Sequence, residues 1–381
     1  MSMTSKERAR TALLGGVPDQ VPFGPNGIDY DIVERILGHE TYVRARGKCL
    51  LACWEGRRDE MVQSLVEDTI ALFKKLDICD IIRADGAGPV PPKGYQPEAP
   101  RRIDAVTWEF ADGRVFKYSE LTGEITMVYD PQEWTRTLQE DDYPLEFEYE
   151  EPDPSVYELI DAVIDAFGDS RFLLGAFPLA NEWVQPGGMA RSLLEMAERP
   201  ALVERALQST MAEAKVRQAH WTNRGIDGII AGTDWAFRSG TFMSPEMWRR
   251  FCYPALEANV KATHEAGLIY VKHACGNNWA ILDDMMAAGV DCYQSIQASA
   301  SMDLAQVREA TRGRMALWGG VLLEHLVAGT PDEVRQDVRT AMEVAKEGGG
   351  FILGSSHSIA VGTQYDNFMA MLDEFDKLRA Y

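Results

Sequence analysis

The sequence predicts an α/β fold, a single (β/α)8 TIM-type barrel with an N-terminal helical segment and a β-meander insertion. Eight short apolar runs each precede a segment of helical pattern; this alternation is typical of a parallel sheet, and eight units close a barrel. No glycine-rich phosphate-binding motif follows the first run, which disfavours the alternative, an open doubly wound sheet. The expected strands are Val21–Asn26, Ile78–Asp85, Arg171–Phe177, Asp227–Trp235, Leu268–Cys275, Val290–Ile296, Met315–Val321 and Gly350–His357.

The chain of 381 residues can hold one large barrel or two medium domains, and we expect one domain over 1–381. Residues 1–20 are a helical extension in which Thr4 or Ser5 caps a helix that a glycine pair ends. The remaining helices are expected at 30–76 with breaks, near 154–167, before 224, from 244 onward, at 278–288, near 302–312, at 331–347 and at 364–379.

Residues 107–129 interrupt this order with three alternating apolar and polar segments. Asp112-Gly113 and Thr122-Gly123 separate them, which is a β-meander pattern. We expect this insertion on the outside of the barrel, where it covers a barrel face or forms the contact of a homodimer. Residues 139–153 are acidic and are expected to form a solvated connector.

Composition limits the partners and the compartment. The net charge of −21 and the pI near 4.7 argue against nucleic acid and against anionic membranes. The N-terminus has no apolar signal region, and no run of about 18 apolar residues occurs. The six cysteines follow no disulfide-module spacing, so we expect a reduced, cytoplasmic protein.

The strongest chemical signal lies at the end of the fifth expected strand. His273 and Cys275 are two residues apart, so on a strand they share one face and form half of a zinc site. His357, at the end of the eighth strand, is the natural third ligand across the barrel mouth. The set leaves a fourth position for substrate or water. The alternative is that Cys275 is a small buried residue and that His273 binds substrate alone.

Other polar residues lie at the same ends of strands, where barrels of this class carry their chemistry. Asp85 and Asp234 are candidate catalytic groups: each is a general acid or base, a counter-ion or a fourth metal ligand, with capping as the alternative. A simple ion pair between Arg83 and Asp85 competes with that role. The candidate substrate-binding residues are Asn26, Arg83, Trp235, Tyr270, Gln294 and Ser356. Core packing is the alternative for Tyr270, and backbone capping is the alternative for Ser356.

Four blocks of the sequence follow one another in order: Ser244-Pro245-Glu246 with Phe251 and Pro254, His273-Ala-Cys275-Gly276-Asn277, Gly329-Thr330-Pro331-Asp332-Glu333-Val334, and Gly350-Phe-Ile-Leu353 leading to His357-Ser-Ile359 and Asn367. Their combined spacing resembles that of the uroporphyrinogen decarboxylase superfamily, which includes the cobalamin-dependent methyltransferases. The resemblance spans nearly the whole chain.

Two positions separate the branches of this superfamily. The decarboxylases carry an arginine-containing stretch that binds substrate carboxylates, whereas Pro22–Asp29 here has no arginine, although Asp85 matches the position of their catalytic aspartate. The methyltransferase branch, which includes methylcobamide:coenzyme M methyltransferases and O-demethylase components, carries the His-x-Cys pair of His273 and Cys275. Its later zinc-binding cysteine is replaced here by His357, which the decarboxylases also carry.

The resemblance therefore implies a methyltransferase that moves a methyl group between a small O-, N- or S-methyl substrate and a corrinoid, with Zn²⁺ as Lewis acid. No Asp-x-His-x-x-Gly cobalamin-ligand motif occurs, so a separate corrinoid protein or free cobalamin is the expected partner. One alternative is a metal-free carboxy-lyase that uses Asp85 and His357 on a smaller acid. Another is a non-catalytic ligand-binding barrel.

Overall fold

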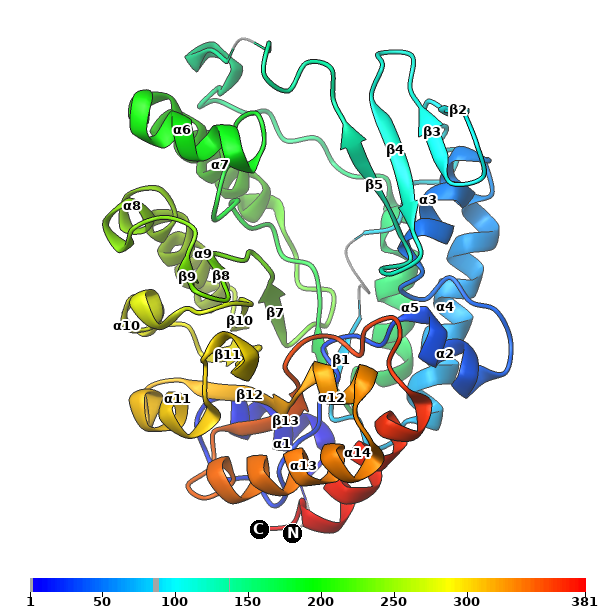
Figure 1. The fold of residues 1–381 in the computed structure, drawn as a ribbon, viewed down its shortest axis with the longest axis vertical. Helices are drawn as coiled ribbons and strands as arrows, with labels where there is room; N and C mark the ends of the chain where they lie inside the picture. The colour runs from blue at the N-terminus through cyan, green and yellow to red at the C-terminus, as the bar shows by residue number, and fades with distance from the viewer. Residues whose placement is uncertain (1–2, 85–88, 137) are drawn as a thin grey trace.

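The computed structural model describes residues 3–84, 89–136 and 138–381. Seven parallel strands form the central sheet in the order β1-β6-β7-β10-β11-β12-β13, which curls into a barrel (Figure 1). Their bounds are β1 Ile81–Arg83, β6 Phe172–Leu174, β7 Gly228–Ala231, β10 Ile269–His273, β11 Cys292–Gln294, β12 Ala316–Val321 and β13 Phe351–Ser355. This TIM-type architecture confirms the predicted fold class.

The first expected strand, Val21–Asn26, is not a regular strand, and this prediction is wrong in detail. The segment still lies between β13 and β1, because Phe23 bridges Leu353 in parallel and its carbonyl accepts from the amides of Asp80 (2.9 Å) and Ile81 (3.2 Å). Pro22 and Pro25 have no amide hydrogen, so the segment cannot maintain a full ladder on both sides. It nevertheless connects the two edges of the seven-stranded sheet.

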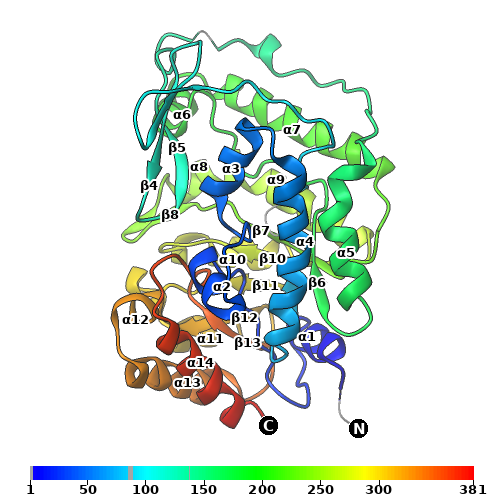
Figure 2. The same cartoon turned by 90° about the vertical axis from the view of Figure 1, so that its right-hand side faces the viewer.

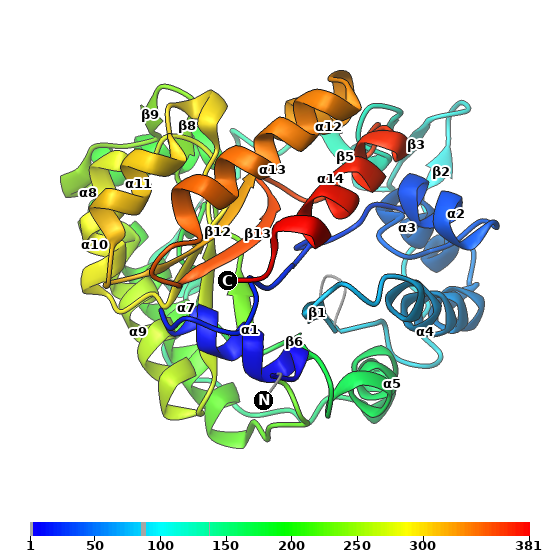
Figure 3. The same cartoon turned by 90° about the horizontal axis from the view of Figure 1, so that it is seen from below.

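Helix α1 (Ser5–Leu13) closes the end of the barrel where the strands begin (Figure 3). Its residues Ala9, Ala12 and Leu13 pack against residues of β1, β6, β10, β11, β12 and β13 in one buried cluster. Thr4 and Glu7 form the capping box that begins the helix.

Further helices surround the sheet and carry its outer hydrophobic layer (Figure 3). They are α2 Tyr30–Leu37, α3 Arg46–Trp54, α4 Arg58–Lys75, α5 Glu158–Phe167, α6 Met189–Glu198, α7 Pro200–His220, α8 Pro245–Phe251, α9 Tyr253–Glu265, α10 Leu282–Ala287, α11 Leu304–Thr311, α12 Leu323–Ala328, α13 Pro331–Ala345 and α14 Tyr365–Leu378. The short α12 was not predicted. No helix among the described residues is long and apolar enough to cross a membrane.

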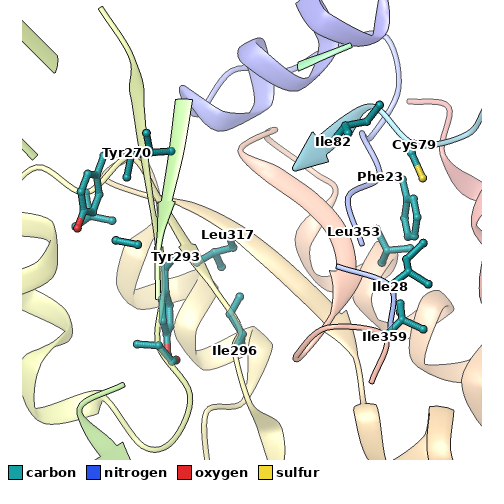
Figure 4. Packing of buried hydrophobic residues seen from close by; sticks show 14 of the residues in the cluster. Phe23, Ile28, Cys79, Ile82, Tyr270, Tyr293, Ile296, Leu317, Leu353 and Ile359 are labelled. Atoms are coloured by element: carbon teal, nitrogen blue, oxygen red, sulfur yellow. The ribbon is translucent and has the colours of Figure 1, made fainter. Parts of the chain in front are cut away.

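Side chains alternate between the interior and the outer layer along each strand, as the pleat requires. On β10, Ile269 and Val271 belong to the interior cluster, whereas Tyr270 belongs to the outer one. Figure 4 shows part of this outer layer, with Tyr270 and Tyr293 extending from their strands. This alternation decides which residues of β10 can reach the site.

The predicted meander is an antiparallel sheet of four strands, β2 Arg101–Arg102, β3 Thr107–Glu109, β4 Val115–Ser119 and β5 Glu124–Tyr129. It lies against α3 on the side of the molecule opposite the termini (Figures 1 and 2). The Trp54 and Trp108 rings contact each other with centroids 5.8 Å apart, and the Gly47 amide donates to the Gly123 carbonyl. A two-stranded hairpin, β8 Ala236–Phe237 and β9 Gly240–Thr241, follows β7.

Candidate metal centre

The structure brings the three predicted metal ligands together at the open end of the barrel. His273 ends β10, Cys275 follows two residues later, and His357 follows β13. One ligand atom from each lies within 4.8 Å of the other two. The Nε2 atom of His273 is 3.4 Å from the Sγ atom of Cys275.

The turn after β10 holds Cys275 in place. Gly276 adopts a φ of +84°, and a Cβ atom there would lie 2.3 Å from the Ala236 carbonyl oxygen, so only glycine fits. The amide group of Asn278, which is fully buried, donates to the carbonyls of Ala274, Cys275 and Gly276. No pattern in the sequence distinguishes Asn278, because its role depends on the turned backbone.

Hydrogen bonds at Nδ1 set the orientation of both imidazoles. Gln294 on β11 uses its amide nitrogen to donate to the Ser355 carbonyl (3.3 Å), so its oxygen faces His273 and accepts from Nδ1. His357 Nδ1 lies 3.0 Å from the Ser358 hydroxyl oxygen. Each ring therefore keeps Nε2 for a ligand, and the partner on the other nitrogen has the orienting role found in metal sites.

Burial sets the protonation states in a way that suits a metal. It lowers the pKa of His273 to about 4 and also lowers the pKa of His357, so both rings are neutral near pH 7. Burial raises the pKa of Cys275 to about 12, so the thiol is protonated without a metal. The Ser295 hydroxyl lies 3.7 Å from Sγ and can donate to a thiolate there.

The donor set and its spacing fit zinc. Tetrahedral zinc with nitrogen at 2.0–2.1 Å and sulfur at 2.3 Å separates two ligand atoms by about 3.6 Å. The 3.4 Å between His273 Nε2 and Cys275 Sγ is close to this value. Two nitrogens and one sulfur leave a fourth position open, as catalytic zinc sites require.

Asp234 lies beside this centre on the loop after β7. Its Oδ1 atom accepts from the Cys275 amide (2.7 Å) and is 3.9 Å from His273 Nε2, and its side chain is 46% exposed. The other predicted catalytic carboxylate, Asp85, lies outside the described residues. Asp234 therefore contacts the candidate centre.

The candidate substrate-binding residues fall into two groups. Asn26 is near the centre, since its amide donates to Gln294 (3.3 Å), and Arg83 lines a cavity of about 30 Å³ with Asn26 and Arg44. Sequence reasoning missed Arg44, which comes from a loop distant in sequence and pairs with Asp29 at 2.6 Å.

The structure does not bring the other three candidates to the centre. Trp235 and Tyr270 have no exposed surface and belong to the outer layer. Tyr270 is three residues from His273, and this odd spacing directs it to the opposite face of β10. The Ser356 hydroxyl accepts from the Leu323 amide at the start of α12, which matches the capping alternative.

A cavity of about 1000 Å³ opens next to the centre and reaches Asp234. Its walls come from Arg136, Leu138, Asp142 and Tyr143, from the segment after β6 and from the β7–β9 region. Trp183 and Phe242 form an aromatic pair in its wall, with ring centroids 5.2 Å apart. These aromatic residues carried no spacing signal in the sequence.

Comparisons with known proteins give a family and a fold. The family model for uroporphyrinogen decarboxylase (URO-D) matches residues 149–378, more than half of the chain. No curated protein matches. A methyltransferase from Methanosarcina mazei is 18% identical, with 99% of each chain covered and a TM-score of 0.63, so the two share the fold. A 3-keto-D-glucoside 4-epimerase from E. coli is 15% identical over 58% of this chain and 83% of that chain, with a TM-score of only 0.30.

Proposed function

The chain belongs to the uroporphyrinogen decarboxylase family, and from this premise we propose that it is a corrinoid-dependent methyltransferase. It would move a methyl group between a small O-, N- or S-methyl substrate and a corrinoid. The corrinoid would be bound to a separate protein or would be free cobalamin. The observation that carries the proposal is the convergence of His273, Cys275 and His357, with Nδ1 of each ring already engaged. The fold shared with the Methanosarcina mazei methyltransferase supports it.

The three ligands would hold Zn²⁺ through two Nε2 atoms and one Sγ atom. When bound there, zinc supplies Lewis acidity toward the substrate heteroatom. Gln294 and Ser358 keep the two rings in orientation, and Ser295 donates toward the thiolate.

The large cavity would hold the substrate, with Trp183 and Phe242 packing against its apolar part. In the demethylation direction, the methyl group would pass to the cobalt of a cob(I)alamin-type corrinoid, which supplies the electron pair of the new bond, while the electron pair of the broken bond stays on the substrate heteroatom. The heteroatom then takes a proton from solvent, and the Asp234 carboxylate, which lines this cavity, can accept a hydrogen bond from the water that delivers it.

Metal analysis of protein purified without chelator tests the proposal. We expect close to one zinc per chain and its loss in His273→Ala and in Cys275→Ser. His325→Ala is the control, because His325 pairs with Asp337 outside the site (2.9 Å). Zinc-dependent methyl transfer from a methoxylated or methylamine compound to cob(I)alamin should accompany the metal. A folded, zinc-free wild-type protein would reject the zinc mechanism and favour the metal-free lyase.

A further inference from the structure

A buried ion pair lies directly behind the candidate centre, in the outer layer of the barrel. Lys272 and Glu182 have side-chain exposures of 0% and 2%, and Lys272 Nζ is 2.5 Å from Glu182 Oε2. The Tyr270 hydroxyl donates to the other oxygen of Glu182. The Trp235 ring lies under the same ammonium group, with its centroid 3.8 Å from Nζ. None of these four residues has a role in the proposed reaction.

The Lys272 ammonium joins three segments that build the site. Lys272 and its two partners, Trp235 and Glu182, are each adjacent in sequence to a residue of the candidate centre or of the cavity wall. Lys272 precedes His273, Trp235 follows Asp234, and Glu182 lies between Asn181 and Trp183 of the cavity wall. On β10 successive side chains point to opposite sides, so anchoring Lys272 behind the sheet fixes the direction of His273 in front. Trp235 and Glu182 lie in loops, where anchoring their side chains restrains the backbone that carries Asp234 and Trp183.

Glu182 is held on its own side by the outer helices. Asn259 of α9 accepts from the Ala180 amide (2.8 Å) and donates to the Ala180 carbonyl (2.9 Å). Gln218 at the end of α7 donates to the Pro178 carbonyl (2.8 Å). The carboxylate therefore reaches Lys272 from a backbone that the helices already fix.

Stability by itself gives no reason for this arrangement. Well-packed apolar side chains can replace a buried ion pair without loss of stability, because removing two charges from water is costly. An ammonium group differs from an apolar side chain in that it attracts a carboxylate and an aromatic face at the same time. Here those two partners come from different loops.

We propose that Lys272 is a positioning residue that fixes Asp234 and the Asn181–Trp183 wall relative to His273 and Cys275. The identity of the centre as a zinc site rests on the proposed function, whereas the coupling of the three loops does not. The hydrogen bond from the Cys275 amide to Asp234 reports the coupling directly, because it joins the β7 loop to the β10 turn.

The test is a charge-free double variant, Lys272→Met with Glu182→Gln, since each single variant leaves a buried charge without its partner. We expect a melting temperature within a few degrees of wild type, yet amide hydrogen exchange at Cys275 at least about tenfold faster. Zinc affinity should fall by about tenfold, as for other supporting residues of metal sites, and the absorption spectrum of the Co²⁺-substituted protein should change. The Ser356 amide, which donates to the Val321 carbonyl of the neighbouring strand β12 (2.7 Å), serves as the internal control and should keep its exchange rate.

Arg8→Met is the matched control variant. Arg8 forms a buried pair with Asp80 near the opposite end of the barrel (2.7 Å), so its loss should lower stability and leave Cys275 exchange and the Co²⁺ spectrum unchanged. A double variant with wild-type exchange at Cys275 and a wild-type Co²⁺ spectrum overturns the proposal.

Should the double variant not fold, the Trp235→Phe variant decides the question by the same measurement. Because its cation–π contact with Lys272 is weaker, amide exchange at Cys275 should become about threefold faster. An unchanged exchange rate rejects the positioning role. If the wild-type protein binds neither Zn²⁺ nor Co²⁺, the proposed function is rejected. The amide exchange rate at Cys275 still tests the positioning role of Lys272 in that case.

Discussion

At the scale of single residues, Gln294 has the most specific role. It is fully buried, and its one oxygen receives both the His273 ring and the Asn26 amide. Because its nitrogen donates to Ser355, the amide cannot turn without losing hydrogen bonds. The ring of His273 therefore keeps one orientation before any metal arrives.

Gln294→Met tests this role. The variant preserves side-chain length but removes the acceptor, so the imidazole loses its fixed orientation. We expect zinc affinity to fall about 10- to 100-fold, measured by competition with a chromophoric chelator. Gln336→Met on the exposed surface of α13 is the control and should bind zinc as wild type does. Equal affinities in the two variants would contradict the role of Gln294.

The pH dependence of zinc binding follows from Cys275. Burial raises its pKa to about 12, so binding at lower pH must displace a thiol proton. Apparent affinity should then rise about tenfold per pH unit from pH 7 to pH 9, where both histidines are already neutral. Chelator competition at pH 7, 8 and 9, corrected for the titration of the chelator, measures the slope. Cys275→Asp, with a ligand that is ionised throughout this range, should abolish the slope; a flat profile in wild type would contradict the assignment.

At the scale of elements, the turn after β10 decides whether Cys275 faces His273. The strand supplies the alternation, but the turn requires the left-handed backbone of Gly276 and the close approach of Ala236. Asn278 then satisfies the carbonyl groups that the turn leaves without strand partners.

Gly276→Ala is predicted to disrupt the centre. The variant adds the left-handed strain of about 1–2 kcal/mol and also a clash with the Ala236 carbonyl, so the turn must move. Gly267→Ala is the matched control, because Gly267 has a φ of +75° and open space around its Cβ position. Urea unfolding and zinc content measure both variants. We expect both to lose stability and only Gly276→Ala to lose zinc; zinc retained in Gly276→Ala would show that the turn tolerates the shift.

At the scale of the whole molecule, Asp80 ties the chain ends to the barrel. It is 1% exposed and accepts from Arg8 (2.7 Å), from the Phe23 amide (2.9 Å) and from Arg379 (3.1 Å). These partners come from α1, from the segment Val21–Asn26 that lies between β13 and β1 in the barrel, and from the C-terminal end of the chain. A single carboxylate therefore supports the place where no regular eighth strand forms.

Asp80→Asn should lower the free energy of unfolding by about 1.5–3 kcal/mol, because the Arg8 and Arg379 guanidinium groups each lose a charged hydrogen-bond acceptor, while Asp19 still pairs with Arg8 (2.8 Å). Asp77→Asn is the control: Asp77 pairs with Arg171 at the surface, and its loss should cost about 1 kcal/mol or less. Urea denaturation gives both values, and zinc content should not change in either. Similar midpoints for the two variants would contradict the role of Asp80.

Much of the fold and the main ligand pair could be predicted from local patterns. Apolar runs in the sequence located the seven strands of the central sheet. The spacing of His273 and Cys275 placed both side chains on one face of β10. The same alternation placed Tyr270 on the other face, so that candidate could have been rejected from the sequence. Trp235 could not, because it follows the end of β7 and its direction depends on the loop and on Lys272.

The sequence by itself determined the parallel barrel, the capped first helix and the His-x-Cys pair, because these depend on periodicity and on neighbours a few residues apart. Only the tertiary structure decided the rest: that His357 comes within reach of that pair, that Gln294 and Ser358 orient the rings, and that an irregular segment occupies the eighth place. The approach of His357 and the place of the irregular segment depend on contacts between residues far apart in the chain, and the role of Gln294 depends on the pairing of β10 with β11. Such contacts form only when the closed barrel brings the strand ends together, so no local pattern records them.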